Sequence, residues 1–408
     1  MSPNSQKRLL RVYSEKCKVM PGYELIGEEE FNEIKSIFTE SNGVLFGHGF
    51  DKLRNGRFRA RELESEFQRT LGVKYALTCT SGTMAQFAAM SYYGVGPGDE
   101  VITQAHTFVA TIETIIALGA TPVLTESDAS FNMCAEDLKT KISEKTKLII
   151  PVHMLGFGAN MNEIMATASM FDIPVLEDAC EALGGKQKSK YLGTLGQIGI
   201  FSLDFAKTIT TGEGGLIVTN DKEAFEWLRN FCDHGHTNNP KKPRGLDDRQ
   251  GPGLNLRMSD LQAAVGLAQI KKLDQIVARN RHIYWDLRNG LAKAFEFRHN
   301  YDSEELFDTL IITKLKPGVK NKIIKTLTAN GYSTKNIPDA MDWHFAGNMH
   351  NMFNENSRYY RSYSTDWKKT RIMLESSIAL PISLKFDLTD IQAIIKIFND
   401  EANSFNHS

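Results

Sequence analysis

The chain has 408 residues, of which 41% are hydrophobic and 24% are charged, and its formal net charge at pH 7 is −1. This length predicts two domains, and a charge balance so close to zero argues against a protein that binds nucleic acid or a membrane surface. The N-terminal segment has basic residues but no continuous apolar core, and no stretch approaches the ~20 apolar residues of a membrane span.

The five cysteines are scattered along the chain, and no two of them have the C-x-x-C spacing of a zinc site or a redox pair. An odd number of cysteines fits a reducing compartment, in which thiols stay unpaired. We therefore expect no bound metal, and we place the protein in the cytoplasm.

Short apolar runs alternate with helical patterns through the first half of the chain. Runs of this length, separated by helices, are typical of βαβ units and a mostly parallel sheet. Strands are predicted over residues 75–79, 100–103, 122–125, 147–152, 173–177, 199–203 and 215–219. Helices are predicted over residues 84–93, 110–118, 136–141, 162–170 and 222–231.

The pattern changes after residue 237. Residues 238–253 are rich in Pro, Gly and charge, which predicts a long surface loop. The next predicted elements are a helix over 258–273, a helix to about 291, a strand near 310–312, and helices over 320–330 and 389–399. We therefore expect a large domain over residues 1–285 and a smaller α+β domain over residues 286–408.

Two segments at predicted strand ends suit a phosphorylated ligand with a basic ring. Thr80-Ser81-Gly82-Thr83 opens a helix, whose free N–H groups and dipole favour a phosphate. The same tetrapeptide could be an ordinary helix cap without a ligand. Glu177-Asp178-Ala179-Cys180-Glu181 ends a strand, where ligands of open α/β sheets bind, and a carboxylate there could keep a ring nitrogen protonated. Asp178 could equally be a helix N-cap or a surface acid without a ligand.

Two further segments complete the set. Ser202-Leu-Asp-Phe-Ala-Lys207 leads into Gly212-Glu-Gly-Gly215, and a lysine beside a serine and a Gly-rich turn is well placed to react with an aldehyde cofactor. Lysines are normally solvated, but the apolar strand before Lys207 and the tight return after it argue against that here. Gly253-Leu-Asn255-Leu-Arg257-Met258 precedes a helix and is a weak signal alone.

Together with Thr107-Phe108-Val109-Ala110-Thr111, these segments resemble, in order, the motifs of the DegT/StrS family of sugar aminotransferases. Enzymes of that family are fold-type I enzymes that use pyridoxal 5′-phosphate (PLP). The resemblance is close over about residues 20–285 and looser beyond. It implies an α/β, aspartate aminotransferase-like fold, in which a large domain has a mostly parallel seven-stranded sheet and a smaller C-terminal domain is α+β.

The resemblance also implies residue roles. Lys207 would bind the cofactor covalently and carry protons between substrate and cofactor, and Asp178 would pair with the pyridine nitrogen. The other cofactor contacts would be Gly82, Thr83 and Ser202 at the phosphate, Phe108 against the ring, and Asn255 at the phosphate of the neighbouring subunit. A homodimer with shared active sites follows from the last assignment.

Glu181 departs from the family, whose members usually have Gln or His at this position, near the phenolic oxygen of the cofactor. Because an ionised carboxylate repels a phenolate, Glu181 must be protonated, turned away or compensated if it is a cofactor contact.

The implied reaction moves an amino group from a donor, expected to be glutamate, to a keto- or aldehydo-sugar. The segment 44–61 carries Arg54, Arg57, Arg59 and Arg61, which could be a solvated charged loop or a pocket for a carboxylate. These arginines, and the histidine-containing stretches around His153, His234 and His344, resemble the branch that makes 8-amino-3,8-dideoxy-manno-octulosonate for lipopolysaccharide. We therefore take the 8-oxo octulosonate as the first candidate acceptor, with Arg54, Arg57, His234 and His344 as candidate substrate contacts.

Three alternatives remain. A 3- or 4-keto nucleotide sugar could be the acceptor instead. A PLP-dependent sugar dehydratase of the same fold would have histidine in place of the lysine, and Lys207 argues against it. A non-catalytic regulator of this fold would be expected to lose Lys207 or Asp178, and both are present.

Overall fold

The structure is a computed structural model that describes residues 21–406, apart from residue 240, residues 243–245, 350–351 and 353–365. Its centre is a sheet built in two hydrogen-bonded sections, β1-β9-β8-β5 and β3-β2-β4. Isolated bridges from Ile149 to Val175 and from Val152 to Asp178 join the two sections. The strands are β1 (Tyr75–Cys79), β2 (Glu100–Gln104), β3 (Thr121–Thr125), β4 (Thr146–Ile149), β5 (Leu176–Asp178), β8 (Ile198–Ser202) and β9 (Gly215–Thr219).

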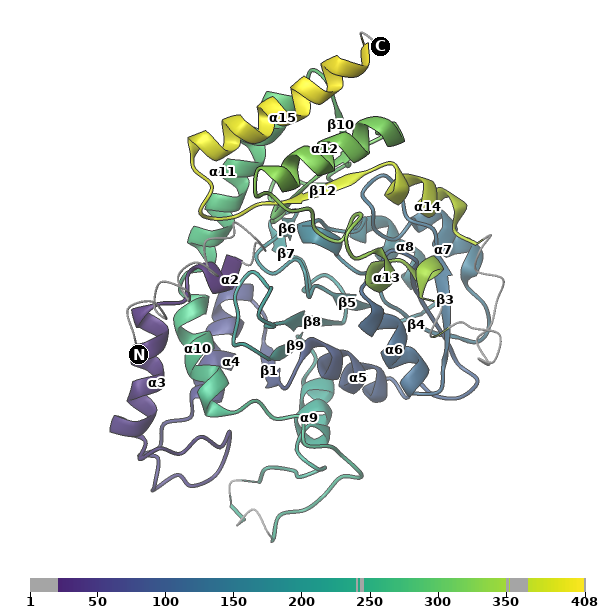
Figure 1. The fold of residues 1–408 in the computed structure, drawn as a ribbon. Helices are drawn as coiled ribbons and strands as arrows, with labels where there is room; N and C mark the ends of the chain where they lie inside the picture. Colours follow the sequence, from purple (N-terminus) through teal and green to yellow (C-terminus); the bar gives the residue numbers. More distant parts are fainter. Residues whose placement is uncertain (1–20, 240, 243–245, 350–351, 353–365, 407–408) are drawn as a thin grey trace.

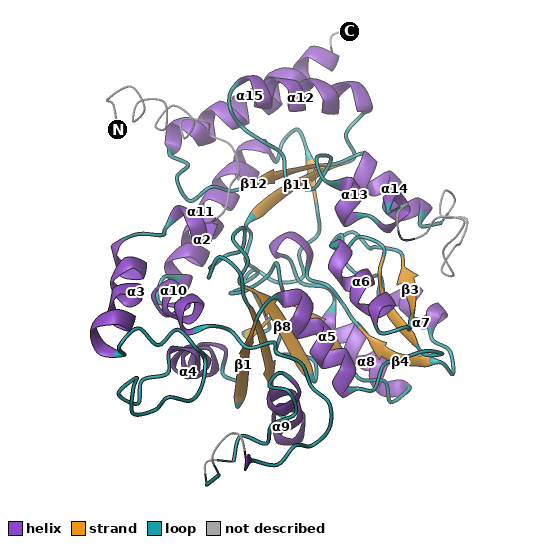
Figure 2. Cartoon of the chain, turned by 60° about the horizontal axis from the view of Figure 1, so that its bottom comes forward, coloured by secondary structure: helices purple, strands orange, loops and turns teal. Residues whose placement is uncertain are grey.

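Within this sheet β9 runs antiparallel to both β1 and β8, while the other paired strands are parallel. Helices cover both faces (Figures 1 and 2). These are α4 (Arg59–Leu71), α5 (Gly82–Tyr92), α6 (Val109–Ala117), α7 (Ala135–Lys141), α8 (Met161–Met170), α9 (Lys222–Phe231) and α10 (Asp260–Ile270).

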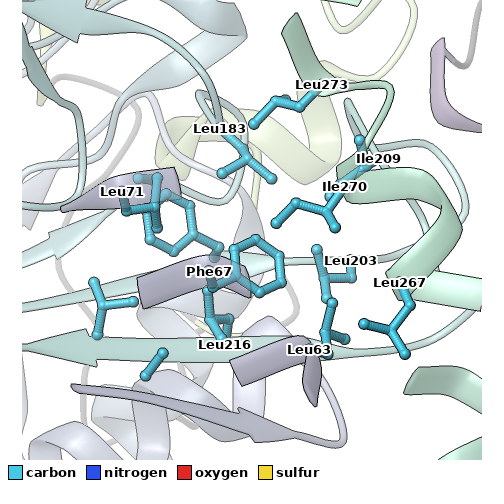
Figure 3. Close-up of a cluster of buried hydrophobic side chains, with 14 of the residues drawn as sticks. Leu63, Phe67, Leu71, Leu183, Leu203, Ile209, Leu216, Leu267, Ile270 and Leu273 are labelled. Atoms are coloured by element: carbon cyan, nitrogen blue, oxygen red, sulfur yellow. The ribbon is translucent and has the colours of Figure 1, made fainter. Parts of the chain in front are cut away.

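Continuous apolar runs form the central strands because both of their faces are buried. In β9, Leu216 and Val218 pack towards α4 and α10, whereas Ile217 packs towards α5 and α9. Figure 3 shows the first of these clusters, in which Leu63 and Phe67 of α4 meet side chains from the sheet and from α10. The sheet is therefore fixed from both sides, and the ends of its strands are held in place.

The N-terminal helix α3 (Glu28–Glu40) lies beside α10, as Figure 1 shows, and the short helix α2 (Pro21–Glu24) precedes it. Small additional elements are the hairpin β6 (Lys186–Gln187) and β7 (Lys190–Tyr191), and the short helix η1 (Met154–Gly156). The described residues of 238–253 are mainly turns and irregular backbone, with a 3-10 conformation at Leu246 and a bridge from Arg249 to His236, in keeping with the predicted loop.

The C-terminal part is an antiparallel sheet, β10-β11-β12, with helices packed on it. Its strands are β10 (Glu296–Phe297), β11 (Thr309–Thr313) and β12 (Ile378–Pro381). Its helices are α12 (Pro317–Ala329), α13 (Met341–His344), η3 (Ala346–Asn348), α14 (Lys368–Glu375) and α15 (Leu388–Asn406).

One helix connects the two parts. In α11 (Leu273–Leu291), Leu273, Ile276 and Val277 belong to the core of the large part. Ile283, Tyr284, Leu287 and Leu291 of the same helix belong to the C-terminal core. The division expected at residues 285/286 therefore falls inside a continuous helix that both cores share, and it stays a prediction. None of the described helices is both long and apolar enough to span a membrane.

Candidate active site

A cavity of about 360 Å³ opens where the large part meets the C-terminal part. The carboxyl ends of β5 and β8 and the N-terminus of α5 face it, which is the usual ligand position in open α/β sheets. It brings together eight residues singled out in the sequence: Gly82, Thr83, Phe108, Asp178, Glu181, Ser202, Lys207 and His344.

The N-terminus of α5 contributes Gly82 and Thr83. Ser81 caps the helix by accepting a hydrogen bond from the Met84 N–H at 3.1 Å. A Cβ atom on Gly82 would lie 2.9 Å from Cys180 Sγ and 3.0 Å from Ser202 Cβ. Glycine at this position therefore lets the helix start approach the ends of β5 and β8, and the first N–H groups of a helix have no intrahelical acceptor.

Asp178 ends β5 and is buried, with 6% of its surface exposed. The Thr111 hydroxyl donates to Oδ2 at 3.1 Å, and the Cys180 N–H donates to Oδ1 at 3.1 Å. Burial raises the pKa of Asp178 above its usual value, and these hydrogen bonds and the Lys207 charge offset only part of that rise. The carboxylate is thus held in one orientation, and a cationic partner in the cavity would stabilise its charge.

Lys207 and Glu181 face each other across the cavity, with Nζ 3.6 Å from Oε1. Burial by itself would raise the pKa of Glu181, but the charges of Lys207, Lys335 and His344 and the Leu155 N–H lower it to about 2. Burial likewise lowers the pKa of Lys207, but the neighbouring carboxylates outweigh it and raise that pKa. Glu181 is therefore ionised and compensated, which is one of the three states open to it from the sequence.

Phe108 and His344 line the cavity on the side of the C-terminal part. Phe108 caps α6 and stacks on Trp343 with centroids 6.4 Å apart and planes at 15°. His344 lies 5.4 Å from the Phe108 ring, and its Nδ1 is 2.8 Å from the Ala340 carbonyl oxygen. Burial lowers the pKa of His344 below its usual value. This side of the cavity gives a planar ligand an aromatic surface on which to lie.

Arg54 and Arg57 lie away from the cavity, and the substrate contacts expected from them are wrong for this chain's own site. Arg54 is fully buried, pairs with Asp260 at 3.5 Å and donates to the Phe46 carbonyl. Arg57 pairs with Glu33 at 3.3 Å and Glu62 at 3.1 Å, and also with Glu40. Their charges are already used inside the fold, so neither is available for a carboxylate here.

His234 and Asn255 do not line the cavity of their own chain either. Both are exposed and lie near one another, since Asn255 bridges to Asp233 in an antiparallel pairing. His234 therefore does not contact a substrate bound in this chain's cavity. The role expected for Asn255 concerns a neighbouring subunit and stays a prediction.

Several cavity residues were not singled out in the sequence. Gln86 lies on α5 three residues after Thr83, so helical spacing could have indicated it. Thr111 of α6 ends the Thr107–Thr111 motif, but the sequence gives it no separate role. Asp308, Lys335 and Asn336 come from the C-terminal part, and only the fold brings them to the cavity. Lys335 Nζ lies 3.3 Å from Asp308 Oδ2.

The residues of this cavity fit a PLP molecule. The α5 N-terminus, kept open by the missing Cβ of Gly82, suits the phosphate. The buried carboxylate of Asp178 suits a protonated ring nitrogen, and Lys207 suits an aldehyde. Among the described residues, no group of three or more His, Cys, Asp or Glu side chains could hold a metal ion.

Comparison with known proteins decides the family. The model of the DegT/DnrJ/EryC1/StrS aminotransferase family matches residues 48–399. The chain belongs to this family. The family binds PLP, which confirms the cofactor predicted from the sequence.

Among curated relatives, the GDP-perosamine synthase of Caulobacter vibrioides is 39% identical over 232 residues, which are 56% of this chain and 61% of that protein. The alignments with this and two other similar relatives span 60–65% of the relatives' lengths. Solved structures give the fold. An aminotransferase from Psychrobacter cryohalolentis has a TM-score of 0.81 and 24% identity over 94% of this chain and 98% of its own. NtdA from Bacillus subtilis, with bound PMP, has a TM-score of 0.80 and 22% identity over 95% of this chain and 86% of its own. The predicted fold class is confirmed.

Proposed function

We propose that this family member is a PLP-dependent aminotransferase that takes an amino group from glutamate and delivers it to a keto-sugar. The observation that carries the proposal is the presence of Lys207 and the buried Asp178 in one cavity beside the open start of α5. The presence of both residues speaks against the dehydratase, in which histidine would replace the lysine, and against a regulator that has lost its catalytic groups.

The bound cofactor supplies an aldehyde that exchanges with amines and a ring that accepts electrons from the substrate carbon. The chain's own residues do the rest. Lys207 Nζ would hold the cofactor aldehyde and serve as the group that carries a proton within the site. Asp178 would keep the ring nitrogen protonated, and Thr111 and the Cys180 N–H hold the Asp178 carboxylate in place.

For the acceptor, we propose a nucleotide-linked keto-sugar. The carboxylated 8-oxo octulosonate was favoured by Arg54 and Arg57, and both arginines are neutralised away from the cavity. His344 is the remaining support for that acceptor from the present chain. Relatives that are 39% and 38% identical are named GDP-perosamine synthases, which favours a GDP-linked sugar.

A half-reaction screen tests this proposal. The enzyme is first converted to its amino form with glutamate, then mixed with a GDP-linked 4-keto-sugar or with 8-oxo-3,8-dideoxy-manno-octulosonate. We expect the aldehyde absorbance to return faster with the nucleotide sugar. A faster return with the octulosonate would restore the carboxylated acceptor, and no conversion by glutamate would remove the aminotransferase proposal itself.

We further propose a homodimer in which Asn255 completes the partner's site. Large apolar side chains are exposed on two adjacent segments, since the Asp260 N–H bonds to the Leu45 carbonyl at 2.9 Å. These side chains are Leu45, Phe46, Phe50 and Leu53 on one segment and Leu254 and Leu261 on the other. Exposed apolar surface of this kind marks an interface.

Mixing two defective variants checks the shared site. Asn255→Ala and Lys207→Ala should each be strongly impaired. If Asn255 acts across the interface, a hybrid dimer has one intact site, so an equal mixture refolded together should regain about a quarter of wild-type activity. An active monomer in sedimentation, or no recovery in hybrids of proven composition, would contradict the assignment.

A further inference from the structure

The charge of the cavity is unfavourable for the ligand that it is proposed to bind. Its described lining carries five carboxylates, which belong to Asp178, Glu181, Asp204, Glu213 and Asp308. Against them stand the two lysines 207 and 335, and no arginine is among the described lining residues. PLP adds a phosphate and a phenolic oxygen to this acidic surface, so the position of each cation matters.

Glu181 is the carboxylate expected to lie near the phenolic oxygen of the cofactor, so its negative charge matters most for cofactor binding. Its side chain is 10% exposed, and the Leu155 N–H donates to Oε2 at 2.9 Å. The backbone of Leu155 has a positive φ of 55°, and the buried Arg298 donates to the Met154 carbonyl at 3.0 Å in the same turn. The Arg298 hydrogen bond therefore fixes the turn whose N–H binds Glu181, and this restrains the carboxylate from moving away from the cavity.

Lys207 is the nearest cation to Glu181, but its charge is not permanent. An amine reacts with an aldehyde in its unprotonated form, so Lys207 Nζ must release a proton before it binds the cofactor. At that moment Glu181 loses the ammonium group that lies 3.6 Å away. A second cation is then required if the carboxylate is to remain ionised beside an anionic ligand.

Lys335 is the second cation. It lies in the segment between α12 and α13, and its side chain is 24% exposed. Asp308 anchors it at 3.3 Å, and Asp308 is itself fixed, because the Thr309 hydroxyl donates to Oδ1 at 3.0 Å. Gly156 lets Asp308 approach the large part, since a Cβ there would lie 2.4 Å from Asp308 Oδ1. Lys335 and Glu181 line the same cavity, and the charge of Lys335 is one of the causes that lower the pKa of Glu181.

We propose that Lys335 is a positioning residue whose charge compensates Glu181 and so allows the cavity to accept the anionic cofactor. The side chain is not a catalytic residue in this account. The titratable groups that interact with Glu181 include Lys207, Lys335, His344, His106 and Cys180, and burial lowers the pKa of both histidines. The inference rests on the proposed function, because it takes PLP as the ligand.

A double-mutant cycle tests the compensation. The titration is done in a Lys207→Ala background, which lacks the Lys207 charge throughout. The cofactor-depleted full-length Lys207→Ala parent and its Lys335→Met, Glu181→Gln and double variants are titrated with pyridoxamine 5′-phosphate, which binds without a covalent bond. We expect Lys335→Met to weaken binding by about tenfold or more, because it leaves Glu181 less compensated. Glu181→Gln should bind as well as the Lys207→Ala parent or better. In the Glu181→Gln background, Lys335→Met should change affinity by no more than about threefold.

The recovery of affinity that Glu181→Gln should give to Lys335→Met distinguishes charge compensation from a structural role of Lys335. Asp308 loses its partner in both Lys335→Met proteins, so damage through Asp308 would appear equally in both backgrounds. Equal weakening in the two backgrounds, or no weakening in either, would overturn the proposal. Lys335→Arg keeps the charge and should keep the affinity, and Lys335→Gln replaces the Met variant if that one does not fold.

Lys314→Met is the matched control, because Lys314 is an exposed lysine that pairs with Glu296 on the surface of the same part. It should leave binding unchanged. Failure of the cycle is distinguishable from failure of the proposed function. If the wild type binds the cofactor and reacts with glutamate, but the effects of the two substitutions on affinity are additive, only the role of Lys335 is contradicted. If the wild type does not bind pyridoxamine 5′-phosphate, both the role of Lys335 and the proposed function are contradicted.

Discussion

Lys207→Ala is expected to abolish the covalent attachment of the cofactor and to lower aminotransfer by about 10⁴-fold or more, because the nucleophile and the proton carrier are lost together. The wild-type protein should be yellow and the variant should not retain the absorbance of the lysine-bound cofactor. The geometry supports this expectation, since Lys207 lines the cavity and directly faces the ionised Glu181.

The cavity offers a matched control for the attachment site. Lys335 is the other lysine in its described lining, so chemical access alone would allow either lysine to react. Reduction with borohydride followed by peptide mapping should find the cofactor on Lys207 and not on Lys335. A label on Lys335, or an unchanged spectrum in Lys207→Ala, would show that the nucleophile is assigned to the wrong residue.

The strands of the large sheet could be predicted from the sequence because local pattern and tertiary role agree there. Residues 75–79 and 215–219 were predicted as strands, and they are β1 and β9 with the same bounds. Every residue of β9 is buried, so an unbroken apolar run was the right signal. The predicted helices do not include α4, although Leu63, Phe67 and Leu71 recur at helical spacing and are buried. The many charged residues of this segment obscure that apolar period.

The arginines show what a sequence pattern leaves open. The segment 44–61 shows four arginines, and nothing local distinguishes a ligand contact from an internal ion pair. The partner of Arg54 is Asp260, which lies more than 200 positions later in the chain. Arg59 is also buried, and its guanidinium donates to the hydroxyls of Ser41 and Ser36 at 2.9 and 2.7 Å. Only the fold brings these partners together.

The state of Glu181 required the same long-range information. Glu181 is a carboxylate at a position where the family resemblance implies Gln or His, and the sequence leaves three states open for it. Whether Glu181 is ionised depends in part on Lys335, which the C-terminal part brings to the cavity, and on the Leu155 N–H. Lys335 has no motif around it, so its role follows from placement alone. Gly82, Asp178 and Ser202, by contrast, lie at a helix start or at strand ends, positions that the local sequence pattern indicates.

Asp178→Asn should fold normally and yet lose aminotransfer by roughly 100-fold or more, the range found when one electrostatic contact to developing charge is removed. Asparagine keeps the shape and can still accept from the Cys180 N–H, while the Thr111 hydroxyl can turn to accept from the new amide. What disappears is the negative charge that keeps the ring nitrogen protonated.

Asp178→Asn should not lower the thermal stability of the cofactor-free protein, although it lowers activity. The pKa of Asp178 is raised in the folded cofactor-free protein, so its contribution to stability is greatest below the unfolded pKa of about 3.8 and is lost as the pH rises. At pH 7 the buried carboxylate therefore opposes folding, and the melting temperature of the cofactor-free variant should equal or exceed that of the wild type. Asp286→Asn, which alters an exposed acid 3.5 Å from His282, is the control and should change neither property. Near-wild-type turnover of Asp178→Asn with glutamate would show that another group holds the ring nitrogen.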